Sequence, residues 1–343
     1  MYSKMTKQKK SKKKNDIERL QEKLKTLINV GKECSKIKPE THYEAHTWTA
    51  IKLISLLCYV DVYSRIMFKQ KRNLNLSEII YIDPLAGSGT NRIRETGDII
   101  AGSPLISGVF SSFKFDKYFF AEENYDKRIA LQARLENLLK DEGKRKRVII
   151  EDDCNKLLKR VMNYLSSLNN KAHYLLFIDS EGIETNWKEL SEVLYYPGDL
   201  VFVFQIREVI EQINRWKNYS AVTKFFGNEK WKECRNEREL LDLYKAQIKG
   251  IKTTWGKGRE VIDDLTIKSS EKDPSPYYYN MIFAALRTKG ENPWFKNLLP
   301  YLKEKVARYS GNSVKQALDV LTGRSTRIDW FLPSRGSTLD NFF

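Results

Sequence analysis

A short glycine-rich turn is the first stretch of the sequence whose residue types could do chemistry. Residues 81–92, YIDPLAGSGTNR, run from an apolar segment into Asp83 and then through Gly87-Ser88-Gly89. Glycine allows positive φ angles and lets the backbone approach a ligand closely. The stretch is therefore a candidate binding turn for a small polar or charged molecule, or else a turn without a ligand.

The residues after the turn distinguish between three candidate ligands: a nucleoside triphosphate, a dinucleotide and S-adenosylmethionine. A triphosphate-binding loop requires Lys and then Ser or Thr after its last glycine, whereas Gly89 is followed by Thr90-Asn91-Arg92. The dinucleotide fingerprint requires a third glycine, which is missing there. A strand ending in Asp, followed by D-x-x-A-G-x-G, fits S-adenosylmethionine better, because a nearby acid can hold its ammonium group. We therefore assign to a cofactor site Asp83, Pro84, Ala86, Gly87 and Gly89.

Two later acidic segments supply further cofactor-binding candidates. Glu122 and Glu123 follow an apolar run, and Glu122 would accept hydrogen bonds from both ribose hydroxyls of a nucleoside. Asp153 and Cys154, in EDDCNKLL, lie where an adenine amino group would be met. The wide gap between Asp83 and Glu122 requires an inserted loop, NRIRETGDIIAGS. Together these residues predict S-adenosylmethionine as the cofactor.

A fourth acidic segment, Asp179-Ser180-Glu181-Gly182, is the candidate catalytic site. Asp179 and Glu181 could raise one another's pKa and supply a general base for a hydroxyl or a ring nitrogen. The alternative is that Glu181 simply points into solvent on a loop. A metal-dependent nuclease using Asp179, Glu181 and Lys188 is a third interpretation, but it leaves the glycine turn without a role.

These residues must be positioned by elements whose pattern is readable in the sequence. Strand-like apolar runs cover 78–83, 117–122, 147–152, 173–179 and 199–206. Helical patterns between them cover 103–113, 125–140, 154–168 and 186–194. Such alternation predicts an α/β fold with a doubly wound, mostly parallel sheet. The carboxyl ends of its strands would gather the acids at one edge, where open α/β sheets bind ligands.

The rest of the chain divides around this sheet. We expect a disordered basic arm over 1–15, N-terminal helices over 16–70 (16–33 and 44–69), a Rossmann-like domain over 71–305, and a helical extension with a tail over 306–343. A helical insert is predicted at about 207–260, followed by an antiparallel hairpin from 264–270 and 277–288. The tyrosines at 277–279 could stack bases, although aromatic residues entering a strand are usually core.

Charge and composition indicate an acidic partner. The net charge is +16, and residues 1–15 contain seven lysines and no acid, which suits either a solubilising tail or a contact to nucleic-acid phosphates. Basic residues at 144–147 and 249–259 add to this surface. The 30% charged fraction leans toward the pattern of thermophilic proteins.

The cysteines, the histidines and the lengths of the apolar runs indicate the cellular location and whether a metal site is expected. Four isolated cysteines and no apolar run of membrane-spanning length predict a reduced, cytoplasmic protein without a membrane segment. His42 and His46 would share one face of a helix and could bind a metal. No third ligand is evident, however, so an ordinary structural role is favoured and no metal is assigned.

Several segments, taken in order over roughly residues 41–305, carry a family resemblance. They are HTWTAIKLI, YIDPLAGSGT, AGSPLI, YFFAEEN, DDCNKLL, LLFIDSEG, FFGNEKW and YYYNMIFAALR. They resemble the three-Cys-motif partner (TcmP) proteins, a family similar to class I S-adenosylmethionine-dependent methyltransferases. The resemblance implies a Rossmann-like methyltransferase domain and a companion protein with three cysteines in a radical-enzyme-like motif.

The chain departs from this pattern at its fourth strand end. The family tends to show Asp-Pro-Phe-Gly there, and base aminomethyltransferases show Asp-Pro-Pro-Tyr, whereas this chain has Asp179-Ser180-Glu181-Gly182. The aromatic residue that would stack a flipped base is missing, which argues against methylation of an exocyclic amine. We expect a methyltransferase acting on nucleic acid or a nucleic-acid-associated substrate. The alternative is a nucleic-acid- or partner-binding protein that keeps the fold without catalysis.

Overall fold

The computed structural model describes residues 16–139, 147–270, 276–287 and 293–325; the predicted arm at 1–15 and the tail beyond 325 lie outside them. Seven strands form the main sheet in the order β6-β5-β2-β7-β8-β10-β9. Their bounds are β2 (Glu78–Asp83), β5 (Lys117–Ala121), β6 (Val148–Glu151), β7 (Ala172–Asp179), β8 (Gly198–Phe204), β9 (Val261–Lys268) and β10 (Tyr278–Ala285). The first five are parallel, and β10 is antiparallel to both β8 and β9.

This strand order confirms the predicted fold class. From β2 the chain moves outward to β5 and β6, and then returns to β7 on the other side of β2 and continues to β8. The sheet is therefore doubly wound, with its topological switch point between β2 and β7. With the antiparallel β9–β10 hairpin at one edge, the chain has a Rossmann-like, class I methyltransferase fold.

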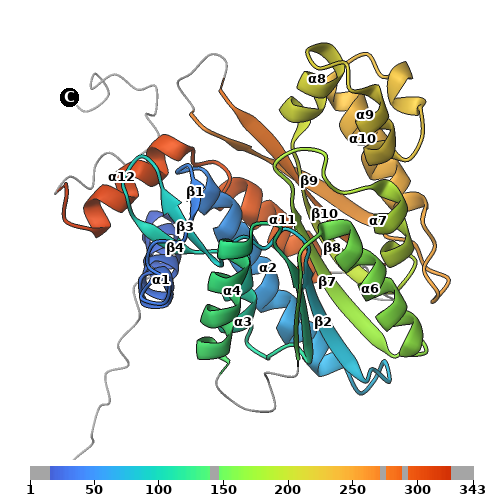
Figure 1. Ribbon diagram of the computed structural model, residues 1–343, viewed down its shortest axis with the longest axis horizontal. Helices are drawn as coiled ribbons and strands as arrows, with labels where there is room; N and C mark the ends of the chain where they lie inside the picture. The colour runs from blue at the N-terminus through green and yellow to red at the C-terminus, as the bar shows by residue number, and fades with distance from the viewer. Residues whose placement is uncertain (1–15, 140–146, 271–275, 288–292, 326–343) are drawn as a thin grey trace, which may run out of the picture.

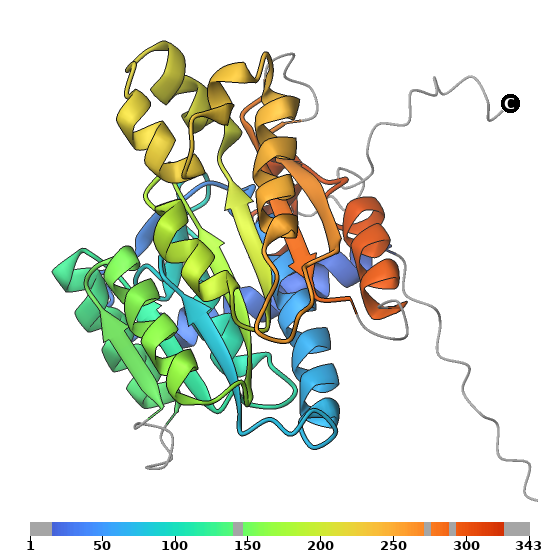
Figure 2. The same cartoon turned by 90° about the vertical axis from the view of Figure 1, so that its right-hand side faces the viewer.

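Helices cover both faces of the sheet (Figures 1 and 2). One face carries α1 (Asp16–Ser35), α2 (Thr49–Gln70), α3 (Ser103–Val109), α4 (Tyr125–Leu138), α11 (Pro293–Lys305) and α12 (Gly311–Leu321). The other carries α6 (Cys154–Ser167), α7 (Trp187–Leu194), α8 (Ile206–Asn214), α9 (Tyr219–Phe226) and α10 (Glu237–Gly250), with the short 3-10 helix η1 (Lys230–Glu233). The helices from α8 to α10 occupy the range of the predicted insert.

Alternation along the strands explains why two hydrophobic cores form. In β2, Ile79 and Tyr81 pack into the core with α2, whereas Ile80 and Ile82 pack into the core with α6 and α7. Successive strand side chains point to opposite faces, so a strand covered on both sides must be apolar throughout. All seven residues of β8 are buried, and apart from Gly198 and Asp199 they are Leu, Val or Phe.

A second, three-stranded sheet lies where the sequence predicted a loop and the start of a helix. The expected loop at 91–103 is a hairpin of β3 (Thr90–Ile93) and β4 (Ile99–Ala101), which pairs in parallel with β1 (Tyr43–Ala45). The helix predicted from residue 44 therefore begins only at Thr49. His42 and His46 flank a strand, so their predicted placement on one helix face is wrong.

A buried arginine fastens this small sheet to the main one. Arg134, on α4, is fully buried and donates hydrogen bonds to five backbone carbonyls. Four of them belong to residues 34–41, from the last turn of α1 to the segment before β1, and the fifth belongs to Ser88 in the glycine turn, at 2.8 Å. Burial lowers the pKa of Arg134 to about 10, and the carbonyls compensate for part of the lost hydration.

The first prediction concerns this arginine. Arg134→Lys keeps the charge but not the planar fork of donors, so several buried carbonyls lose their partner. We expect the free energy of unfolding to fall by on the order of 2–4 kcal/mol, measured by urea denaturation. Glu136→Gln, at an exposed position of the same helix, is the control and should change it by less than about 0.5 kcal/mol. Equal stability of Arg134→Lys and the wild type would contradict the role given to the five hydrogen bonds.

Candidate functional site

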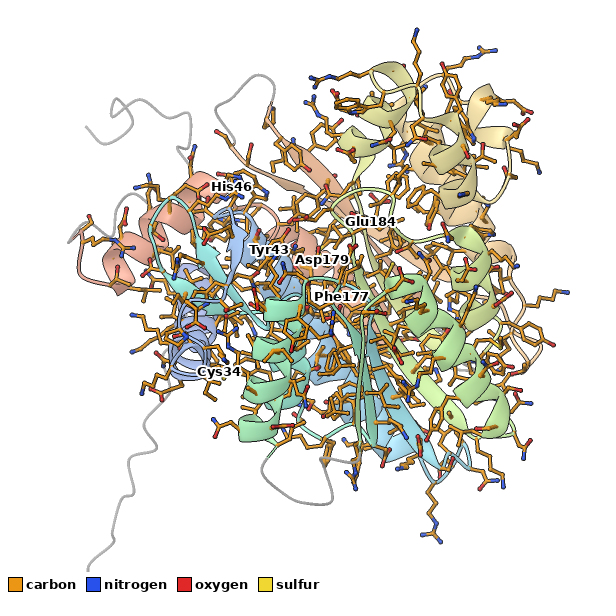
Figure 3. The ribbon with its side chains drawn as sticks, viewed as in Figure 1. Cys34, Tyr43, His46, Phe177, Asp179 and Glu184 are labelled. Atoms are coloured by element: carbon orange, nitrogen blue, oxygen red, sulfur yellow. The ribbon has the colours of Figure 1, made fainter. Side chains whose placement is uncertain are left out.

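A cavity of about 810 Å³ lies at the carboxyl ends of the parallel strands. Its size is typical of small-molecule sites, which span roughly 300–1,000 Å³. Figure 3 shows Asp179 near the upper end of β7, between Tyr43 and Glu184, with Phe177 deeper along the same strand. The cavity wall includes Pro84, Ala86, Gly87, Gly89, Glu122, Glu123, Asp153, Cys154, Asp179 and Glu181. Every predicted site residue except Asp83 thus lines one cavity.

The glycine turn forms the wall above β2. Gly87 and Gly89 have φ angles of +63° and +84°, which L side chains rarely adopt. A Cβ atom on Gly87 would meet no atom closer than 3.9 Å, so the conformation rather than crowding requires glycine there. The Ala86 N–H donates to the carbonyl of Ala121 at 2.9 Å and ties the turn to the end of β5.

Asp83 lies beneath the turn, fully buried, and not on the cavity wall. Its Oδ1 accepts a hydrogen bond from the Leu85 N–H at 3.3 Å, while Oδ2 has no hydrogen-bond partner among the described residues. Burial raises the pKa of Asp83 to about 7, and nearby Asp179 adds to the increase. Asp83 thus supports the turn from below.

The acids at the next two strand ends are held by backbone donors. The Oε1 of Glu122 accepts from the Asn124 N–H at 2.8 Å, and burial raises the pKa of this carboxyl group. Asp153 caps α6, since its Oδ1 accepts from the Lys156 N–H at 2.7 Å. Cys154 is buried beside it, and burial raises the pKa of its thiol to about 12. Each carboxylate keeps a second oxygen that these contacts do not use.

Asp179 has a partner that sequence reasoning missed. Lys52, on α2, is nearly buried, and its Nζ lies 2.7 Å from Oδ1 and 2.6 Å from Oδ2 of Asp179. A lysine inside the apolar run of α2 was the only available signal, because 127 residues separate the two partners. The same Nζ lies 5.9 Å from the centre of the Tyr279 ring.

Glu181 is paired differently from the prediction. It is exposed at the cavity rim, and its pKa is raised by partial burial and by the carboxylate of Glu184, not by Asp179. Glu184 in turn accepts hydrogen bonds from Ser180 Oγ and, at 3.1 Å, from the Gly182 N–H. The loop therefore holds two acids of different character: Asp179 beside a cation and Glu181 beside another carboxylate.

The remaining wall is contributed by residues that the sequence analysis did not assign to the cofactor or catalytic site. Trp48 directly precedes α2, and Lys52 lies in its first turn. Gln205 follows β8, Tyr277 directly precedes β10, and Tyr279 lies at the start of β10. Lys188, proposed for a nuclease site, does not line this cavity. Within the described ranges, no group of three or more His, Cys, Asp or Glu side chains is arranged to hold a metal ion.

Comparisons with known proteins give a fold likeness and no family. No protein-family model and no curated protein matches the sequence. Protein LPL1258 of Legionella pneumophila str. Philadelphia 1 (family-model DUF519) has a TM-score of 0.40 at 10% identity, over 75% of this chain and 93% of that chain.

Two further solved structures match this chain at lower scores. Trm1 from Pyrococcus horikoshii, in complex with S-adenosyl-L-methionine, has a TM-score of 0.36 at 13% identity, over 67% of this chain and 54% of that chain. The methyltransferase domain of bacterial CtHen1 has a TM-score of 0.31 at 12% identity, over 67% and 97%. Likeness at this level concerns the general fold, so the function must be argued from the site.

The nearly buried ion pair generates the second prediction. Removing Lys52 leaves the carboxylate of Asp179 without its cation, so Lys52→Met should lower the free energy of unfolding at pH 8 by on the order of 3 kcal/mol. The double variant Lys52→Met/Asp179→Asn removes both charges and should recover part of the loss. Urea unfolding of the two single variants and the double variant measures the coupling, expected at about 1–3 kcal/mol. Additive effects would show that the pair is not coupled.

The buried acid under the turn generates the third prediction. An acid whose pKa is higher in the folded than in the unfolded chain makes stability fall as pH rises between the two values. For Asp83 these are about 4 unfolded and about 7 folded. Asp83→Asn should therefore match the wild type near pH 4 and exceed its stability at pH 8 by on the order of 2–4 kcal/mol. Thermal or urea unfolding across this range measures the difference, and exposed Asp242→Asn is the control. A pH-independent difference for Asp83→Asn would contradict the raised pKa.

Proposed function

We propose that the chain is an S-adenosylmethionine-dependent methyltransferase, with its cofactor and acceptor sites in the cavity at the switch point. One observation carries the proposal. The cavity brings together the glycine turn after β2, the acids after β5 and β6, and a separate pair of acids after β7. Doubly wound sheets bind ligands in this crevice. The first three segments would hold the cofactor and the last would face the acceptor.

The residues present fit this cofactor. Gly87 leaves open space beside the backbone where the amino-acid part would lie, and Glu122 keeps one carboxylate oxygen for the ribose hydroxyls. Asp153 and Cys154 lie at the wall where the adenine would be met. Carboxylates predominate among the charged wall residues and suit a cofactor that carries a sulfonium and an ammonium cation; they are Glu44, Glu122, Glu123, Asp152, Asp153, Asp179, Glu181 and Glu184. Asp83 would act through the turn, which it supports from below.

The two acids of the fourth loop suit different steps. Asp179, held beside Lys52, would accept a hydrogen bond from the acceptor and orient it. When bound, the cofactor supplies an electrophilic methyl group on sulfur. The lone pair of the acceptor nitrogen or oxygen would form the new bond to carbon, as the carbon–sulfur bond breaks with its pair left on sulfur. Glu181, whose pKa is raised, would then take the acceptor's proton and pass it to solvent.

Nucleic acid, or a substrate associated with it, is the proposed acceptor, because the chain carries a net charge of +16. The four cysteines are free thiols and fit the proposed cytoplasmic, reducing location. No helix in the described ranges has both the length and the apolar character needed to span a membrane. A three-Cys-motif companion remains a proposal that rests on the resemblance in sequence.

A binding protein that keeps the fold without catalysis is the competing function. Asp179 favours it in one respect, because both of its carboxylate oxygens already contact the Lys52 ammonium group, at 2.7 and 2.6 Å. A methyltransferase would transfer methyl groups to its substrate, whereas a binding protein would not. Transfer of a labelled methyl group to RNA, DNA or protein supports the enzyme, whereas cofactor binding without transfer to any of them supports the binding protein.

The fourth prediction tests the cofactor site. Glu122→Ala should weaken binding of S-adenosylmethionine and of its demethylated product by roughly tenfold or more, since a hydrogen bond to a charged group contributes about 1.5–3 kcal/mol. Isothermal titration measures both affinities. Glu136→Ala, on α4 and outside the cavity wall, is the matched control. Unchanged binding by a folded Glu122→Ala variant would make the ribose assignment wrong, and no binding by the wild type would remove the proposed function.

A further inference from the structure

We propose that the half of the cavity above β7, β8 and β10 is a nucleobase subsite in which Tyr277 is the stacking platform. The inference deepens the proposed function, on which it rests, by naming the class of the acceptor. The cavity divides at the switch point: the cofactor candidates lie above β2, β5 and β6, and the other half is lined by Trp48, Lys52, Asp179, Gln205 and Tyr277.

Tyr277 is exposed yet fixed from two sides. Its side chain is 40% exposed, and its hydroxyl donates to the Oε1 of Gln205 at 2.8 Å. Its ring centre lies 5.9 Å from that of Trp48 and 6.5 Å from that of buried Tyr279. An aromatic ring held in place at a cavity wall is preorganised for stacking, because little conformational freedom is lost when a ligand binds.

A chain of contacts links the ring of Tyr277 to the small sheet. The ring of Trp48 stacks on that of His46, with centres 4.2 Å apart and an angle of 9° between planes. Glu95, between β3 and β4, accepts from His46 Nδ1 at 2.8 Å and from the Thr47 N–H at 3.1 Å. Figure 3 shows His46 near β1, on the side of the molecule with the small sheet. The hairpin therefore holds His46, which supports Trp48, which contacts Tyr277.

Polar groups beside the platform match the edge of a base. Asp179 offers carboxylate oxygens, Lys52 offers an ammonium group, and Gln205 keeps its amide nitrogen as a donor because its oxygen is used by Tyr277. A nucleobase presents donors and acceptors along one planar edge. An apolar aromatic side chain of a protein would leave these buried polar groups unmatched, at a cost in affinity. The wall thus favours a nucleobase over an aromatic amino acid.

An exposed basic and aromatic corner continues from the subsite. Helix α8 starts directly after Gln205 and is followed by Arg215, Trp216 and Lys217. Trp216 is 60% exposed, and the Arg215 guanidinium lies 4.9 Å from the centre of its ring. The nine residues of α8 span about 13 Å, so this corner lies within reach of nucleotides that flank a base in the cavity (Figure 1). Exposed aromatic and cationic side chains of this kind bind single-stranded nucleic acid.

The test uses the full chain saturated with S-adenosylhomocysteine, so that the adenine site is filled. Fluorescence anisotropy measures the binding of ten-nucleotide single-stranded RNA and DNA probes of mixed sequence. Tyr277→Ala should weaken binding roughly 5- to 100-fold, whereas Tyr277→Phe, which keeps the ring, should weaken it less than about threefold. Tyr195→Ala, at an exposed tyrosine outside the cavity wall, is the control and should bind like the wild type.

The salt dependence of the affinity distinguishes the loss of base stacking from the loss of a contact to a phosphate. Tyr277→Ala should leave the slope of log affinity against log salt unchanged, while Arg215→Ala should reduce it by about one. Comparison of the two probes shows whether the base comes from RNA or DNA. No binding of either probe, equal binding by Tyr277→Ala and Tyr195→Ala, or Tyr277-dependent binding of an aromatic peptide instead would each overturn the subsite. Because S-adenosylhomocysteine binding is measured first, loss of the cofactor site is seen separately.

Discussion

The buried guanidinium of Arg134 is the interaction on which the arrangement of the site depends. Within the part of the chain that the structure describes it has no carboxylate partner, and its charge is balanced by carbonyl dipoles from two segments far apart in the sequence. One segment is the glycine turn, and the other leads into β1 and then α2. A planar fork of donors can satisfy these carbonyls only in a narrow range of positions. Arg134 thereby fixes the position of the glycine turn, which would hold the cofactor, relative to the segment that leads to Trp48 and Lys52.

The opposite end of the sheet also carries a buried arginine that donates to backbone carbonyls. Arg259 is also fully buried and donates to the carbonyls of Leu194, Tyr196 and Gly198. Burial and this nearby charge lower the pKa of His173 to about 3, so the histidine stays neutral in the core. At the carboxyl edge, in contrast, Asp83 keeps an oxygen without a partner among the described residues. The carboxyl edge therefore retains polar atoms of the kind that a site requires.

The main sheet could be predicted from the sequence because its signals are local. Strands buried on both faces appear as apolar runs, and the run at 78–83 matches β2 at both ends. The small sheet could not be predicted in this way, since β1 is three residues long and pairs with β3 across more than forty residues. Lys52 was visible as a residue, but its partner Asp179 is brought to it only by the fold. Local patterns therefore located most of the cavity wall and indicated that the tyrosines at 277–279 could stack bases, but they did not assign Trp48, Lys52 or Gln205 to the site.

The aromatic residue that is missing at the fourth strand end can be replaced by aromatic side chains from other segments of the chain. Asp179-Ser180-Glu181-Gly182 has no ring to stack a base, and from the sequence alone this argues against methylation of an exocyclic amine. In the folded chain, Tyr277 and Trp48 lie on the same half of the cavity as Asp179, from segments nearly a hundred residues away or more. The Lys52–Asp179 pair also separates the roles of the two acids, because both carboxylate oxygens of Asp179 contact the ammonium group of Lys52. Proton removal then falls to Glu181, whose neighbour Glu184 raises its pKa. A changed motif thus need not mean a changed class of substrate when the fold supplies the same groups from another direction.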